Sequence, residues 1–239
     1  MNDPPRLSPE QLGVALGEAR RATLAASMDL DDSKWRVPVS PWIQPTAWDL
    51  AHVGWFAEFW MLRGPHRLGV DGCQDAAGPA RLFGPDEHYD SARIAHADRW
   101  RIPLLSREQL AQRLADQLGA CVEALGAPTD DIVYFAHLAL FHELMHVEAL
   151  AWTRAQLGYA PPRGLAMPPV PAATAVAVAG GEATVGADAA SGFAFDNETP
   201  PARRRHGAFA TASHPVRHAA FAALVGAAGR GRGDVWPDA

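Results

Sequence analysis

The sequence predicts a mainly α protein, in which a four-helix bundle is followed by an incomplete α+β domain. Between residues 8 and 158, apolar residues recur at three- and four-residue steps in four stretches, which is the period of helices with one buried face. After Gly158 the composition changes to prolines and short valine-containing runs, which indicate turns and strands. The predicted domain bounds are 1–158 for the bundle, 159–173 for a Pro-rich linker and 174–239 for the second domain.

Composition limits the classes of partner. A chain of 239 residues with 48% hydrophobic residues can bury a core in one or two domains. A net charge of -6 with scattered arginines gives no nucleic-acid footprint. No run reaches the roughly 18 apolar residues of a membrane span, and the N-terminus has no signal-peptide pattern, so we expect no membrane partner and a cytoplasmic location. Cys73 and Cys121 form no C-x-x-C pair, so they indicate neither a zinc knuckle nor a disulfide framework.

The first two helices have recognisable starts. Ser8, Pro9 and Gln11 form a capping-box start for a helix that ends near Met28, and residues 29–45 contain three prolines and predict a loop. Thr46, with Asp49 three residues on, predicts a second capped helix that stops at Gly64-Pro65. His52 lies on the inward face of that helix among aromatic residues, where it could be a core histidine or a ligand.

A long crossover separates this helix from the third. Residues 65–105 show no sustained periodicity, and a connection of that length is more often functional than idle. Its polar and aromatic run, 88–100, could equally be a solvated loop with a short helix. Ser106 with Gln109 forms another capping box, for a third helix that ends at Gly126.

The fourth helix begins after Pro128 and carries two histidines. Its predicted inward positions are Phe135, Leu138, Ala139, His142, Met145, His146, Ala149 and Trp152. Residues four apart lie one turn apart on one face, so His142 and His146 have a metal-ligand spacing. A pair of core histidines bonded to backbone carbonyls is the structural alternative.

The motif also fits H-E-x-x-H, the zinc metalloprotease helix in which the glutamate, here Glu143, is the general base. A catalytic zinc needs a third protein ligand, and no histidine follows Gly158 until His206. The upstream His52 is the better candidate for the third ligand. In a bundle, metal sites are built from side chains on facing helices.

The C-terminal part predicts strands at 175–178, 184–185 and 202–209 and a short helix from Ser213-His214-Pro215 to Gly229. It shows no evident closing strand, so we expect less protection from amide exchange there than in the bundle.

Two segments resemble a known enzyme family. Pro45 to Phe56 and the H-E-x-x-H helix resemble the N-terminal, DinB-like metal-binding bundle of ergothioneine-type sulfoxide synthases. Gly192 to Pro200, followed by His214-Pro215-Val216, resembles the opening of the formylglycine-generating-enzyme domain (sulfatase-modifying factor, C-type-lectin-like) that follows in that family. Three segments are more similar to its selenoneine synthase branch than to the mainstream ergothioneine enzymes: Tyr89 to His96, Arg99-Trp100 and Leu138 to Tyr159.

The resemblance implies a mononuclear non-haem iron(II) centre, Fe(2+), with the ligands His52, His142 and His146. Such an oxidoreductase uses O2 to join a selenium or sulfur donor, a selenosugar or a thiol, to the imidazole C2 of hercynine (trimethylated histidine) in selenoneine or ergothioneine biosynthesis. Three neutral imidazoles suit Fe(II) and leave positions for substrates.

Further residues are candidates for substrate binding. Arg93, Arg99 and Trp100 could anchor the chalcogen donor, because a guanidinium group suits carboxylate or phosphate. Met145 stands where the family usually has a glutamine that contacts the imidazole substrate, and it cannot donate that hydrogen bond. Glu143 would point about 100° away from His142, to support the site from behind or to face the surface.

The family's catalytic tyrosine and much of its hercynine pocket come late in the second domain, beyond residue 239. We therefore expect metal binding from the bundle, whereas activity of these residues alone is not implied. Two alternatives stay open. One is a DinB-like metal-dependent thiol transferase or hydrolase, or a metal-binding bundle without oxygenase activity. The other is an interaction protein in which the histidines only fill the core.

Overall fold

The computed structural model describes residues 7–163, 171–188 and 192–228, and it confirms the mainly α fold class. The described residues form two compact units. One consists of residues 7–163 together with 192–195, and the other of residues 171–188 and 196–228. The predicted end of the last helix at Gly229, and residues 164–170 of the predicted linker, lie outside the described residues.

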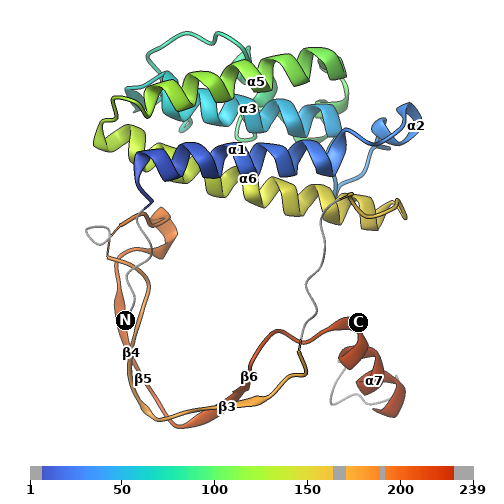
Figure 1. Ribbon diagram of the computed structural model, residues 1–239, viewed down its shortest axis with the longest axis vertical. Helices are drawn as coiled ribbons and strands as arrows, with labels where there is room; N and C mark the ends of the chain where they lie inside the picture. The colour runs from blue at the N-terminus through green and yellow to red at the C-terminus, as the bar shows by residue number, and fades with distance from the viewer. Residues whose placement is uncertain (1–6, 164–170, 189–191, 229–239) are drawn as a thin grey trace. The chain divides into compact units, whose positions relative to one another are not determined.

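The first unit is a bundle of four long helices that lie side by side (Figure 1). They are α1 (Pro9–Ser27), α3 (Thr46–Leu62), α5 (Arg107–Ala124) and α6 (Asp130–Gln156). α1 packs mainly against α6, and α3 packs against both α5 and α6. Trp48 and Phe59 of α3 and Leu110 and Leu114 of α5 are buried in one core cluster, so these two helices share a core.

The predicted helix starts differ in their outcome. Ser8 with Gln11 and Ser106 with Gln109 form complete capping boxes, as predicted. The predicted cap at Thr46 is wrong, because Pro45 precedes the helix and provides no side-chain cap. The Asp49 carboxylate turns into the bundle instead, where it has a histidine partner described below.

The crossover is ordered against α3. It contains the hairpin of β1 (His66–Leu68) and β2 (Gln74–Ala76), the short helix α4 (Asp86–Tyr89) and the 3-10 helix η1 (His96–Trp100). The buried Glu58 carboxylate of α3 accepts hydrogen bonds from the backbone N–H groups of Arg81, Leu82 and Phe83. Asp86 accepts hydrogen bonds from Trp55 and Arg63. A further short helix, α2 (Asp32–Trp35), lies in the predicted loop after α1.

The buried face of α6 differs from the prediction. Met145 and Trp152, predicted to face inward, are 51% and 45% exposed. Glu143 and Arg154 are buried instead, because each pairs with a distant residue: Arg20 Nε lies 2.7 Å from Glu143 Oε1, and Arg154 Nη1 lies 2.6 Å from Asp29 Oδ1. Paired charges can be buried, whereas a hydropathy pattern assigns them to the surface.

The second unit contains two antiparallel ribbons and a helix. β3 (Ala175–Val178) pairs with β6 (Phe209–Ala212), and β4 (Gly181–Val185) pairs with β5 (Ala202–His206). The 3-10 helix η3 (Asp196–Glu198) and helix α7 (His218–Ala228) complete it. The single strand predicted at 202–209 is thus two strands with different partners.

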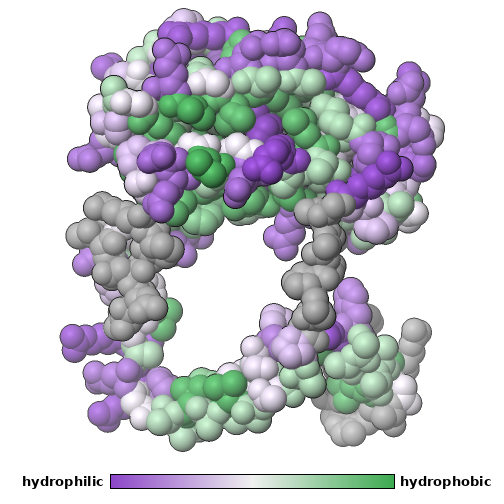
Figure 2. Space-filling view, viewed as in Figure 1, coloured by the Kyte–Doolittle hydropathy of each residue, from purple (hydrophilic) through white to green (hydrophobic). Residues whose placement is uncertain are grey.

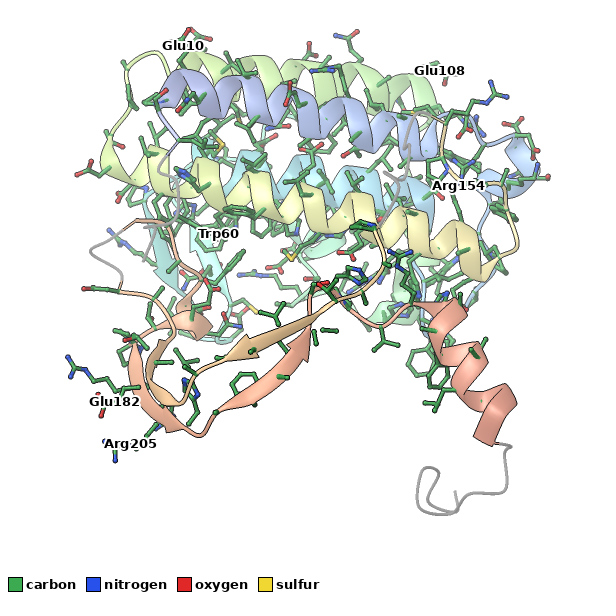
Figure 3. All side chains as sticks on the ribbon, turned by 60° about the horizontal axis from the view of Figure 1, so that its bottom comes forward. Glu10, Trp60, Glu108, Arg154, Glu182 and Arg205 are labelled. Carbon is green, nitrogen blue, oxygen red and sulfur yellow. The ribbon has the colours of Figure 1, made fainter. Side chains whose placement is uncertain are left out.

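No residue between 171–188 or 196–226 is buried. Figure 2 accordingly shows apolar surface on β3, β6 and α7, where Val176, Phe209 and Leu224 are exposed. In Figure 3 the cross-strand partners Glu182 and Arg205 both project outward from their ribbon. Among the helices of the described part, none is both long enough and apolar enough to cross a membrane.

Candidate metal centre

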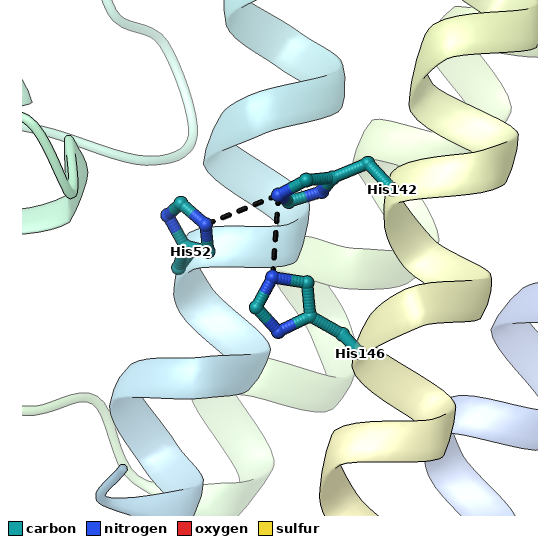
Figure 4. Close-up of side chains that lie close together, drawn as sticks. All are labelled: His52, His142 and His146. Carbon is teal, nitrogen blue, oxygen red and sulfur yellow. Dashed lines mark hydrogen bonds between the residues drawn. The ribbon is translucent and has the colours of Figure 1, made fainter. Parts of the chain in front are cut away.

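Three imidazoles from two helices converge inside the bundle. His52 comes from α3, and His142 and His146 come from successive turns of α6 (Figure 4). His142 Nε2 lies 3.2 Å from His52 Nε2 and 3.2 Å from His146 Nε2. One nitrogen from each residue lies within 4.8 Å of the others, so the three could hold one metal ion.

The outward nitrogens of the rings have different partners. His52 Nδ1 lies 2.6 Å from the Tyr89 carbonyl oxygen, and His146 Nδ1 lies 2.9 Å from Asp49 Oδ1. Both partners can only accept hydrogen bonds, so both Nδ1 atoms carry the proton and both Nε2 atoms present a lone pair. His142 Nδ1 is buried without a hydrogen-bond partner among the described residues, and its ring stacks on Phe56 at 3.7 Å.

The close contacts between the Nε2 atoms bring lone pairs together, and this repulsion is relieved only by a cation between them. His142 Nε2 can carry one proton, and a single N–H cannot align with both neighbouring lone pairs. In every neutral tautomer, therefore, at least one of the two 3.2 Å contacts brings lone pairs together. A metal ion at the centre removes this repulsion, whereas the core-histidine alternative leaves it unrelieved.

The spacing also fits an ion. Two nitrogens each about 2.1 Å from one ion, at angles between about 90° and 109°, are about 3.0–3.4 Å apart. The observed 3.2 Å lies within that range. Imidazole suits Fe, Zn, Ni and Cu, so the ligand type does not choose among them.

Burial keeps two ligands neutral. It lowers the pKa of His52 to about 4, with a smaller contribution from the nearby His146. Burial likewise places the pKa of His142 well below its usual value, and His52 and His146 add to the shift. Burial also acts to lower the pKa of His146, but the charge and hydrogen bond of Asp49 outweigh it, so that pKa is raised. Asp49 thus makes His146 the most basic of the three imidazoles.

Arg99 lies one ring away from the centre, because its guanidinium stacks on Trp48 and Trp48 stacks on His52. Its Cζ lies 4.1 Å from the Trp48 ring centroid, and Trp48 stacks on His52 at 4.8 Å and 9°. Arg99 is 8% exposed, and its Nη1 donates to Gln44 Oε1 at 2.8 Å. Its Nε is buried without a hydrogen-bond partner among the described residues. Burial lowers the pKa of Arg99, while the nearby Asp49 carboxylate opposes that shift.

The other candidate substrate contacts lie in different surroundings. The Arg93 guanidinium forms ion pairs with Asp75 and Asp90. The Trp100 indole donates to the Val37 carbonyl oxygen at 2.9 Å. Met145 is half exposed beside His146. Their proposed roles stay predictions.

Glu143 has a structural environment. Its carboxylate accepts hydrogen bonds from Arg20 and Thr23 of α1, and it is 2% exposed. A carboxylate held in this way is poorly placed to act as the general base of a metalloprotease.

Sequence reasoning missed Asp49 as a member of the centre. The signal was present, because Asp49 precedes His52 by three residues and so lies one turn away on the same face of α3. Its placement near the helix start favoured a cap. Trp48 and Phe56, whose rings stack on His52 and His142, are among the aromatic residues that accompany His52 on the inward face of α3.

Comparison with known proteins finds similarity to hercynine oxygenases. No protein-family model matches the chain. The hercynine oxygenase of Mycolicibacterium thermoresistibile is 32% identical over 238 residues, covering 96% of this chain and 51% of that protein. The hercynine oxygenase of Mycobacterium tuberculosis is 34% identical over 144 residues, covering 60% of this chain and 32% of its own length. The hercynine oxygenase of Mycolicibacterium smegmatis is 31% identical over 201 residues, covering 80% of this chain and 44% of that protein.

The chain spans about half the length, or less, of these curated relatives. Two of the alignments are too long to be confined to the bundle, since they include 201 and 238 residues. By sequence, the chain is similar to hercynine oxygenases over nearly all of its own length.

Proposed function

We propose that this chain carries the metal centre of a non-haem iron(II), O2-dependent synthase that acts on hercynine. The observation that carries the proposal is the convergence of His52, His142 and His146, with two Nε2 contacts of 3.2 Å that no neutral tautomer satisfies together. The similarity to three hercynine oxygenases supports hercynine as the substrate and an oxidoreductase as the class of enzyme.

In this proposal the three histidines hold Fe(2+) through their Nε2 atoms. Iron(II), when bound, supplies the redox and dioxygen chemistry needed to form a bond between a chalcogen and carbon. The chain's own residues prepare the site. The Tyr89 carbonyl and the Asp49 carboxylate hold protons on the outward nitrogens of His52 and His146, and Trp48 and Phe56 shield two rings from water.

The reaction proposed is the joining of a selenium or sulfur donor to the imidazole C2 of hercynine, as in selenoneine or ergothioneine biosynthesis. The selenoneine branch is part of the proposal and rests on the resemblance of residues 89–100. Arg99 is the favoured anchor for an anionic group of the donor, because its buried guanidinium has an unpaired Nε and no hydrogen-bonded carboxylate among the described residues.

The proposed domains follow the same resemblance. We assign the first unit to a DinB-like bundle and the second to part of a domain of the formylglycine-generating-enzyme type. Segment 192–195 has a place in the first unit, because the Phe193 ring packs on Tyr134 and Phe141 of α6 at 5.2 and 5.3 Å. We propose the cytoplasm as the compartment.

Oxygen uptake tests the proposal. Protein loaded anaerobically with iron(II) is mixed with hercynine and either a selenosugar or a thiol donor, and O2 consumption and the product mass are followed. The proposal predicts uptake that depends on both hercynine and the donor. Iron retention without uptake would instead favour a metal-dependent thiol transferase, a hydrolase or a metal-binding bundle, and those activities can be assayed on the same preparation.

A further inference from the structure

Helix α3 supplies two groups to the centre. His52 points one ring nitrogen at the other imidazoles, and Asp49, one turn earlier, reaches His146 on the facing helix. The Asp49 side chain is 5% exposed and that of His146 is 18% exposed, so the contact is shielded from water. A single turn of α3 therefore touches the centre both directly and through a ligand from α6.

The contact fixes how His146 can act. An ionised carboxylate only accepts hydrogen bonds, so it holds the imidazole proton on Nδ1 and leaves the lone pair of Nε2 toward the centre. A ring with its proton on Nε2 would point that proton where the metal must be. Among the described residues, Asp49 is the only carboxylate hydrogen-bonded to any of the three imidazoles.

The three ligands are therefore unequal. His146 has a charged acceptor, His52 has a neutral carbonyl, and His142 has no partner at Nδ1 among the described residues. A charged acceptor increases the electron density of the ring and so strengthens its bond to a cation. Asp49 also places a negative charge beside a site that would receive a divalent cation.

We infer that Asp49 is a positioning residue of the centre, which sets the tautomer of His146 and makes it the strongest of the three ligands. The inference rests on the proposed metal-binding function, but its effect on the tautomer exists without metal. A purely structural role for Asp49, as one more buried partner between α3 and α6, is the competing explanation.

Asp29 provides a matched control. Its carboxylate pairs with Arg154, two turns further along α6, and touches none of the three histidines. Asp29→Asn therefore removes a carboxylate that contacts the same helix without altering the centre. Asp49→Asn is close to isosteric, but its amide can donate to Nδ1 and allow the proton to move to Nε2.

Two measurements test the inference. The first is titration calorimetry of Co(2+), used as an air-stable probe, into the wild type, Asp49→Asn, Asp49→Ala and Asp29→Asn. We expect both Asp49 variants to bind about 10- to 100-fold more weakly and Asp29→Asn to match the wild type. The second is long-range nitrogen–proton NMR of the imidazoles in metal-free protein at alkaline pH. It should show His146 protonated on Nδ1 in the wild type and on Nε2 in Asp49→Asn.

Three results would overturn the inference. They are an unchanged His146 tautomer in Asp49→Asn, Co(2+) affinities of the Asp49 variants within about twofold of the wild type, or an equal loss of affinity in Asp29→Asn. A wild type that binds no metal would contradict the proposed function instead. The NMR comparison would then still decide whether Asp49 controls the tautomer.

Discussion

Glu143 of α6 and Arg20 of α1 form a buried ion pair, with Arg20 Nε 2.7 Å from Glu143 Oε1 and both side chains at most 5% exposed. Arg20 also donates to Gln117 Oε1 of α5, so the pair joins three helices. Removing one partner of a buried pair leaves an uncompensated charge. We expect Glu143→Ala to lower the free energy of unfolding by roughly 3–5 kcal/mol, measured by urea denaturation.

The double variant Arg20→Met/Glu143→Leu is the control for that prediction. It removes both charges, so we expect it to recover most of the lost stability. If Glu143→Ala were as stable as the wild type, the pair would not hold the bundle together. Metal affinity per folded chain should stay near the wild-type value in the double variant, since neither residue hydrogen-bonds a ligand histidine.

Gly54 allows α3 to approach its neighbours closely. A Cβ at this position would lie 2.5 Å from the Phe83 ring and 2.9 Å from Leu114 Cδ2. We expect Gly54→Ala to destabilise the bundle by roughly 1–3 kcal/mol, because both neighbours are buried and would have to move. The measurement is the thermal or urea unfolding midpoint.

Gly119→Ala is the matched control on α5. Nothing lies within 4 Å of a Cβ there, and the residue is exposed. Alanine favours a helix over glycine by about 1 kcal/mol, so this variant should be as stable as the wild type or more stable. Equal effects of the two substitutions would contradict the packing described for Gly54.

Metal-free protein should lose stability on acidification. The pKa of His52 is 6.5 in the unfolded chain and about 4 in the folded chain. Between these two pH values the unfolded state therefore binds more protons. Stability falls as pH falls through this window, by roughly 3 kcal/mol from His52 alone. The lowered pKa of His142 acts in the same direction.

His146 acts in the opposite direction. Its raised pKa contributes stability that is complete below 6.5 and is lost as pH rises through the folded value. We expect the two lowered pKa values to dominate. Unfolding free energies of chelator-treated protein, measured between pH 7 and pH 4, test this. A shallower slope should be seen in His52→Asn, and a wild-type slope in that variant would argue against the buried neutral ring.

Arg99 and Arg93 should differ in their effect on donor binding. Arg99→Ala removes a buried guanidinium whose Nε has no hydrogen-bond partner in the described part of the chain, so the affinity for a donor that carries a carboxylate should fall by about 10- to 100-fold. Arg93→Ala removes a guanidinium that pairs with Asp75 and Asp90 of the chain, and its effect should be smaller. Calorimetric titration of the donor measures both. An unchanged affinity in Arg99→Ala would remove it from the donor site.

Local features of the fold could be predicted from the sequence, and distant partners could not. The capping boxes at Ser8 and Ser106 depend on residues three apart, and both are observed. The one-turn spacing of His142 and His146 likewise follows from helix geometry. By contrast, Glu143 is buried because of Arg20, 123 residues away, and no local pattern identifies such a pair.

Asp49 shows the same limit in the site. Its position three residues after Thr46 favours a capping interaction at the helix start. In the structure its carboxylate instead accepts a hydrogen bond from the His146 imidazole of α6. The strand pairing in the second unit was also not predictable. β3 pairs with β6, which lies more than 30 residues later in the sequence, and the residue pattern within each strand does not specify its partner.

Iron binding by histidine variants tests the central claim most directly. Wild type, His52→Ala and the control His66→Ala, whose ring bonds the Phe59 carbonyl oxygen outside the centre, are equilibrated anaerobically with iron(II), desalted and analysed for iron. We predict about one iron per chain in the wild type and in His66→Ala, and loss of bound iron in His52→Ala. An unchanged iron content in folded His52→Ala would contradict a centre built from these three histidines.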